Sequence, residues 1–267
     1  MKDNIGGISV KNRVLLGEIN RKAKGPFSIN EFAGMLGMPL KRAKRLVLHW
    51  VSMGWLTRIK KGLYSTVPLE AIHPGERRED PWIVAARVFR PCYIGGWSAC
   101  EHWGFTEQIF RDVVVFSGKD IRKRRQVIQG TIYIIKGIKK SKIFGTKPIW
   151  RGQVKVLVSD PRRTIVDLLD EPALGGGIRH VALMVKEYFS GEERNDKELI
   201  EYIKRNNNRA VYKRLGYLIE TLKIDAPVLL TACKINKSSG FANLDPSFPI
   251  KGKIIRKWNL RVNALIP

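Results

Sequence analysis

Residues 28–64 have the sequence SINEFAGMLGMPLKRAKRLVLHWVSMGWLTRIKKGLY, and this stretch predicts the fold of the N-terminal part of the chain. Ser28 and Glu31 have the spacing of a capping box, which predicts the start of a short helix. Gly37 ends that helix, and Pro39 is suited to the first turn of a second one. We therefore expect two helices joined by a tight turn.

The second helix, residues 40–51, has an amphipathic pattern. Its apolar positions recur at helical spacing and predict a buried stripe: Leu40, Ala43, Leu46, Val47, Trp50 and Val51. The opposite face is basic. Gly54 then ends the helix, and residues 56–59 and 63–65 predict two short strands joined by a basic turn. A helix, a turn, a basic helix and a basic hairpin are the outline of a winged helix-turn-helix.

This outline predicts a DNA-binding segment, with the second helix in the major groove and the hairpin on phosphates. The alternative is a helical hairpin whose lysines form an ordinary solvated face. We prefer DNA binding because the basic side chains gather on the face that the apolar stripe leaves free, and because the hairpin is basic too. The predicted DNA-binding residues are Ser28, Lys41, Arg42, Lys44, Arg45, His49, Arg58, Lys60 and Lys61.

The composition indicates a polyanionic partner. Lys and Arg number 49 and Asp and Glu 24 among 267 residues, so the formal net charge is +25. Nucleic acid is the first class of partner that such an excess favours, and an anionic membrane surface is the second. No apolar run of about 18 residues occurs, so we expect no membrane span and no membrane partner. The 3 cysteines do not suggest a disulfide scaffold, and we expect a cytoplasmic protein.

The chain predicts two domains and an α+β fold: a winged helix-turn-helix at residues 1–75 and a mixed α/β domain at residues 81–267. A helix at residues 10–24 is expected beneath the helix-turn-helix. Residues 67–80, with two prolines and a charge cluster, are expected to be the exit from the first domain.

In the second domain, strands are predicted at residues 113–116, 130–135 and 154–158, and short strands at 228–231 and 258–262. Helices are predicted near residues 97–104, 161–169, 178–189, 195–202 and within 206–224. The cap of the second of these is Asp160, followed by Pro161.

Basic residues in the second domain predict a second surface for a polyanion or a protein partner: Arg122, Lys123, Arg124, Arg125, Arg162, Arg163, Arg209, Lys213 and Arg214. The alternatives are structural. Arg163 and Asp167 have the spacing of a helical ion pair worth a few tenths of a kcal/mol. The helix at residues 208–220 is amphipathic, and its basic face is equally compatible with a solvated surface.

The sequence gives no sign of a catalytic centre, a metal site or a cofactor. The cysteines and histidines lack the paired spacing of a zinc site, and no phosphate-binding loop follows the glycines at residues 175–177. A Mg²⁺-dependent nuclease often places a lysine two residues after an acidic residue, and this chain has no such pair. We therefore expect a protein without enzymatic activity. Sequence spacing does not test for a Ser/His/Asp triad, because the three residues of a triad come together only in the folded protein.

Taken together and in order, several segments resemble the AbiEi family, the antitoxins of type IV abortive-infection toxin–antitoxin systems. The matching segments lie within residues 28–222: GWL at 54–56, GLY at 62–64, YIGGWSA at 93–99, DPRRTIVDLL at 160–169 with the glycines after it, and NRAVYKRLGYLIE at 208–220. The unusually basic run at residues 122–142 departs from a compact family member.

The resemblance implies a transcriptional autorepressor. Members of the family bind inverted repeats in double-stranded DNA of their own promoter through the N-terminal module. They also counter a nucleotidyltransferase-like toxin, mainly through the C-terminal domain and without a stable complex. The alternatives are a solitary winged-helix regulator without a toxin and a nucleic-acid-processing enzyme with a nuclease-like C-terminal domain.

Overall fold

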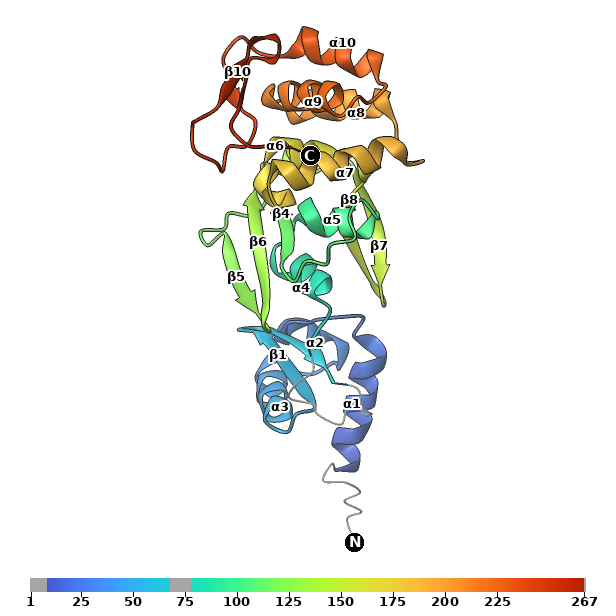
Figure 1. The fold of residues 1–267 in the computed structure, drawn as a ribbon. Coiled ribbons are helices and arrows are strands. Elements are labelled where there is room, and N and C mark those ends of the chain that lie inside the picture. Colours follow the sequence, from blue (N-terminus) through green and yellow to red (C-terminus); the bar gives the residue numbers. More distant parts are fainter. Residues whose placement is uncertain (1–8, 68–77, 267) are drawn as a thin grey trace. The chain divides into compact units, whose positions relative to one another are not determined.

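The computed structural model describes residues 9–67 and 78–266 and has a mixed α+β fold, as predicted (Figure 1). It divides into two compact units. The first contains the described residues up to Val88 together with residues 127–131 and 150–156, and the second contains the remainder. Most of the predicted exit at residues 67–80 lies outside the described residues, as does the predicted end of the first domain at residue 75.

The first unit begins with three helices and a two-stranded hairpin. Their bounds are α1 Val10–Lys22, α2 Ile29–Met35, α3 Leu40–Ser52, β1 Leu56–Lys60 and β2 Leu63–Thr66, and α4 Pro81–Val88 follows. The strands β1 and β2 are antiparallel. The core between the helices is aromatic, because Phe32 and Trp50 are both fully buried with their rings in edge-to-face contact at 5.6 Å.

The helical signals of the sequence are confirmed in α2 but only in part in α1 and α3. The capping box is present, with the Ser28 amide donating to Glu31 over 2.7 Å. In α1 the sequence spacing predicts that Val10, Val14, Leu15 and Ile19 share one buried side. Ile19 is buried together with Leu16, whereas Val10 and Val14 are 64% and 63% exposed. The predicted stripe of α3 is likewise centred on Ala43, Val47 and Trp50, and Leu40 at its first turn is exposed.

A six-stranded mixed sheet forms the middle of the chain, in the order β5-β6-β4-β3-β8-β7. The strands are β3 Cys92–Ile94, β4 Val113–Ser117, β5 Arg125–Ile128, β6 Thr131–Gly137, β7 Thr146–Arg151 and β8 Val154–Ser159. The central pairs β4–β6 and β3–β8 are parallel, and β3–β4 is antiparallel. The two edge strands, β5 and β7, were not predicted, because edge strands expose many side chains and lack a continuous apolar run.

The remaining elements belong to the second unit and are mainly helical. Its helices are α5 Gly96–His102, α6 Pro161–Asp170, α7 Ile178–Ser190, α8 Asp196–Asn206, α9 Ala210–Thr221 and α10 Pro227–Asn236. Three short strands, β9 Ala242–Asn243, β10 Lys253–Ile255 and β11 Leu260–Val262, make a small sheet, and 3-10 turns occur at Lys140–Lys142, Pro172–Gly175 and Arg256–Trp258. No helix within the described ranges has both the length and the apolar composition to cross a membrane.

The predicted strand at residues 228–231 is wrong, because this segment lies inside α10. The prediction of strand at 258–262 is correct only from Leu260, since a 3-10 turn ends at Trp258. Helix α10 packs on α9, which also contacts α6 (Figure 1). Helix α9 is therefore covered on two sides, and most of its side chains are buried, unlike those of a helix at the surface.

Candidate nucleic-acid interface

The basic side chains of α3 lie together on its exposed face. Lys41, Arg42, Lys44, Arg45 and His49 are all exposed, as the helical spacing predicted. The opposite face is anchored by Ala43, Val47 and Trp50, each fully buried. The apolar stripe therefore fixes the rotation of the helix about its axis and directs the cations to solvent.

The hairpin after α3 adds three further exposed cations, Arg58, Lys60 and Lys61. The strand pairing is irregular between Arg58 and Lys60, and the turn closes at Gly62 with φ of 81°. A positive φ is easily adopted by glycine, so the turn is compatible with the sequence IKKGLY. The buried Leu56, Ile59 and Tyr64 hold the hairpin against the core.

These seven lysines and arginines on α3 and the hairpin are unneutralised within residues 9–67 and 78–266, where none of them forms an ion pair with a carboxylate. His49 contacts the ring of Trp55. An exposed cluster of cations without acidic partners has an electrostatic potential that favours polyanions.

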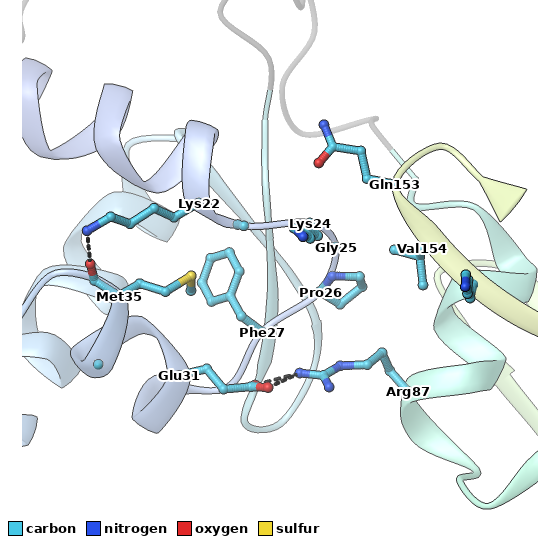
Figure 2. Close-up of a pocket in the computed structure, with 13 residues that line it drawn as sticks. Lys22, Lys24, Gly25, Pro26, Phe27, Glu31, Met35, Arg87, Gln153 and Val154 are labelled. Atoms are coloured by element: carbon cyan, nitrogen blue, oxygen red, sulfur yellow. Dashed lines mark hydrogen bonds and ion pairs between the residues drawn. The ribbon is translucent and has the colours of Figure 1, made fainter.

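Ser28 differs from the other predicted DNA-binding residues because its hydroxyl is already used in the capping box. It accepts from the Glu31 amide over 3.2 Å and donates to the Glu31 carboxylate over 2.9 Å. Arg87 of α4 also donates to both carboxylate oxygens of Glu31, as Figure 2 shows. Ser28 therefore positions α2.

The Glu31 carboxylate is stabilised in its charged form. Partial burial alone would raise its pKa, but the hydrogen bonds from Arg87 and Ser28 outweigh burial and lower the pKa of Glu31 below its ordinary value. The Glu31 carboxylate at the start of α2 is thus held by Ser28, the cap of the same helix, and by Arg87 of α4.

The predicted second basic surface is not a single surface. Arg122, Lys123, Arg124 and Arg125 are exposed at the start of β5, and Arg209 is exposed before α9. For three other residues the prediction is wrong, because Arg163, Lys213 and Arg214 are 2%, 2% and 4% exposed and cannot form part of a surface. Arg162 keeps a side-chain exposure of 13% and lies near Asp160, Glu193 and Glu198, so its charge is neutralised locally.

The buried cations of α9 bind backbone carbonyl groups. Arg214 donates to the carbonyls of Leu169, Asp170 and Asn243 at 2.6–3.2 Å, and Lys213 donates to the carbonyl of Gly240. Burial lowers the pKa of both side chains. These residues connect α9 to the end of α6 and to the chain around β9, which is a structural role.

Arg163 belongs to a buried polar cluster inside the second unit. Its Nε lies 2.9 Å from Oδ1 of Asp167, and the Tyr93 hydroxyl donates to Asp167 over 2.9 Å while accepting from Arg163 over 3.0 Å. The guanidinium also lies 4.2 Å from the ring centre of Phe144. The predicted pairing of Arg163 with Asp167 is confirmed, but the predicted environment is wrong, because the pair is buried and not exposed.

The titratable groups of the second unit are perturbed by burial. Burial raises the pKa of Asp167 to about 6 despite the neighbouring Arg163. It also raises the pKa of the Cys92 and Cys233 thiols to about 12, and that of Cys100 as well, so all three thiols are protonated near neutral pH. In the part of the chain that the structure describes, no three His, Cys, Asp or Glu side chains lie close enough together to hold a metal ion.

Comparison with known proteins gives a likeness in fold alone. No family model matches this chain, and no curated protein matches it. Among solved structures, the chain is similar to the crystal structure of the RV2827C protein from Mycobacterium tuberculosis, with a TM-score of 0.63 and 14% sequence identity. The match covers 93% of this chain and 89% of that one, so the likeness extends over both units.

Proposed function

We propose that the first unit is a winged helix-turn-helix and that the protein is a sequence-specific, double-stranded DNA-binding transcriptional regulator. Helix α3 would enter the major groove, and the β1–β2 hairpin would be the wing. The observation that carries the proposal is the set of exposed cations on one face of α3 and on the hairpin, unpaired with carboxylates among the described residues.

The dimensions and chemistry of α3 support this role. The major groove of B-DNA is about 12 Å wide and admits one helix, and arginine is the commonest side chain that reads guanine there. Arg42 and Arg45 are the arginines on the exposed face of α3. Lys60 and Lys61, at the tip of the hairpin, have the flexible single charges that suit phosphate contacts without sequence preference.

The more specific proposal is an autorepressor that is also the antitoxin of a type IV toxin–antitoxin system. It depends on the resemblance of residues 28–222 to the AbiEi family. In this proposal the second unit counters a nucleotidyltransferase-like toxin without forming a stable complex, and the protein is not an enzyme. Co-expression with such a toxin tests it: restored growth supports the antitoxin role, and unchanged toxicity leaves a solitary regulator.

A nucleic-acid-processing enzyme is the competing class. The deciding experiment is a gel-shift titration of the purified protein on its own upstream DNA beside a scrambled duplex, followed by incubation of both with Mg²⁺. A preference of about 10³ or more for the upstream DNA, with both duplexes intact, supports a regulator. Equal binding to both duplexes contradicts sequence-specific recognition, and cleavage supports the enzyme.

A further inference from the structure

A concave pocket lies beside the capping box of α2, and all of its lining residues belong to the first unit. Its volume is about 540 Å³, within the range of about 300–1,000 Å³ that small-molecule sites occupy. The walls come from the end of α1 and the segment that follows it, from α2, from α4, and from the turn after β7 with the start of β8 (Figure 2). Four separate parts of the sequence therefore converge on one cavity.

The charged lining of the pocket is predominantly positive. Lys22, Lys24, Arg87 and Lys155 contribute cations, and Glu31 is the one acidic side chain that the described residues add to the lining. The Lys22 ammonium already contacts Glu18 and the carbonyl of Met35, and Arg87 contacts Glu31. Among the described residues, Lys24 has no ion-pair or hydrogen-bond partner, and Lys155 has only the ring of Trp150, 4.9 Å from its Nζ.

The remaining lining is largely apolar. Pro26, Phe27, Met35 and Val154 lie along the pocket, and Figure 2 shows them between the side chains of Lys22 and Gln153 above and the Glu31–Arg87 pair below. Such a wall favours a flat ring, whereas the cations favour an anion. Together the two features suit a molecule that joins a ring to an anionic group, and a nucleoside phosphate has both parts.

We propose that this pocket binds a mononucleotide, with its phosphate between Lys24 and Lys155 and its ring against Val154 and the apolar wall beside it. This function is separate from the proposed DNA binding, because neither lysine lies on α3 or on the β1–β2 hairpin. The Glu31 carboxylate faces the same pocket but is neutralised by Arg87 and by the amide and hydroxyl of Ser28. Because Arg87 lines the same pocket, a phosphate between the two lysines attracts its guanidinium in competition with Glu31.

The location of the pocket gives the ligand a route to α2. Glu31 is the third residue of α2 and part of its cap, so any change in the Arg87–Glu31 contact alters the start of the helix that precedes α3. A mononucleotide in this pocket is therefore placed to influence how firmly α2 and the turn before α3 are held.

Isothermal titration of the purified full chain in the absence of DNA tests the proposal. The probes are AMP, GMP, CMP and UMP, with inorganic phosphate and adenosine as the two halves of the ligand. We expect at least one mononucleotide to bind with a Kd of about 100 μM or below, and to bind more tightly than either half. The double variant Lys24→Glu/Lys155→Glu should raise this Kd by about tenfold or more.

The matched control is Lys11→Glu, which reverses an exposed charge on α1 outside the pocket. It should leave the Kd within about twofold. The single variants Lys24→Gln and Lys155→Gln, which introduce no new charge, replace the double variant if it does not fold. The proposal is overturned if no mononucleotide binds, if inorganic phosphate binds as tightly as the nucleotide, or if Lys11→Glu and the pocket variants weaken binding equally. None of these outcomes depends on whether the protein binds DNA.

Discussion

Arg163 and Asp167 form an ion pair one turn apart on α6, with 2.9 Å between Nε and Oδ1 and with 2% exposure for each side chain. Two charges that are removed from water lose hydration, and this loss is repaid only while both partners are present. The sequence spacing alone would assign the pair a few tenths of a kcal/mol, because that is the value for an exposed helical pair. Burial makes the pair far more sensitive to loss of either member.

Substitution Arg163→Ala should lower the free energy of unfolding by about 3–5 kcal/mol, because it leaves the Asp167 carboxylate buried without its counter-charge. Tyr93→Phe removes a hydroxyl that contacts both residues but keeps the ion pair, so we expect a loss of only about 1–2 kcal/mol. Urea denaturation of both variants measures the difference. Equal small losses would show that the pair is not buried in solution.

The pH dependence of stability should contain a contribution from Asp167. Burial raises its pKa from 3.8 to about 6 in the folded state. Between these values the folded protein binds more protons than the unfolded chain, so the stability contributed by protonated Asp167 is complete below pH 3.8 and is lost as the pH rises through 6. The slope should reach at most about −1.4 kcal/mol per pH unit.

Asp167→Asn removes this titration and serves as the reference. The free energy of unfolding of the wild-type protein minus that of Asp167→Asn should therefore fall from about pH 4 to pH 6, because all other groups cancel in the difference. A difference that stays constant or rises over this interval would mean that the folded-state pKa of Asp167 is not raised.

Gly216 lies inside α9 directly against the indole ring of Trp258, and a Cβ at this position would overlap that ring. Gly216→Ala should therefore destabilise the second unit by about 1–3 kcal/mol, the usual cost of overpacking a core. Gly17 of α1 is the control, because a Cβ there meets no atom within 4 Å. Gly17→Ala should stabilise by about 0.5–1 kcal/mol, and thermal unfolding of both variants distinguishes the two signs.

The sequence predicted those elements whose signals are local. Ser28 with Glu31 gave the start of α2, Asp160 with Pro161 gave the start of α6, and the spacing of Ala43, Val47 and Trp50 gave the basic face of α3. Each depends on residues within a few positions of one another, so a periodic pattern is sufficient to find them.

Features that depend on contacts between distant segments were missed. Lys213 and Arg214 belong to an amphipathic helix that α10 covers. The sequence VLLT at residues 228–231 of α10 predicts a strand, because it resembles a short buried strand, and this hid the covering helix. Pro227 at the first turn of α10 was the available signal for a helix. The pocket beside α2 gave no signal in the sequence, because Lys24 lies before α2 whereas Lys155 lies in β8, and most of the helices and strands of the first 150 residues separate them.

If α3 reads the major groove, substitutions in α3 should change sequence specificity, whereas substitutions in the hairpin should change the affinity for all sequences. Arg45→Ala, where Arg45 contacts a base, should cost about 1–3 kcal/mol of binding free energy on the specific site and relax specificity. Lys60→Ala should weaken binding to all sequences alike and reduce the slope of log K against log salt by about one. Fluorescence anisotropy with specific and scrambled duplexes at several salt concentrations separates these effects.

Lys186→Ala, which removes an exposed lysine from α7, is the matched control for loss of charge. It should change neither the specificity ratio nor, by more than a small amount, the salt slope. The docking proposal is contradicted if Arg45→Ala and Lys186→Ala are indistinguishable on the specific duplex.

Arg209 and Arg214 were predicted to share a surface. The structure predicts that replacement by alanine lowers the stability of the protein strongly at Arg214 and hardly at all at Arg209. Arg214→Ala leaves the carbonyls of Leu169, Asp170 and Asn243 without their donor in a buried site, so it should lower the free energy of unfolding by about 2–4 kcal/mol. Arg209→Ala affects an exposed side chain and should stay within about 0.5 kcal/mol of the wild type. Urea denaturation measures both, and any effect of Arg209→Ala on DNA binding then reflects an interface, because the fold is unchanged. Similar losses of stability in the two variants would show that α9 is not covered as described.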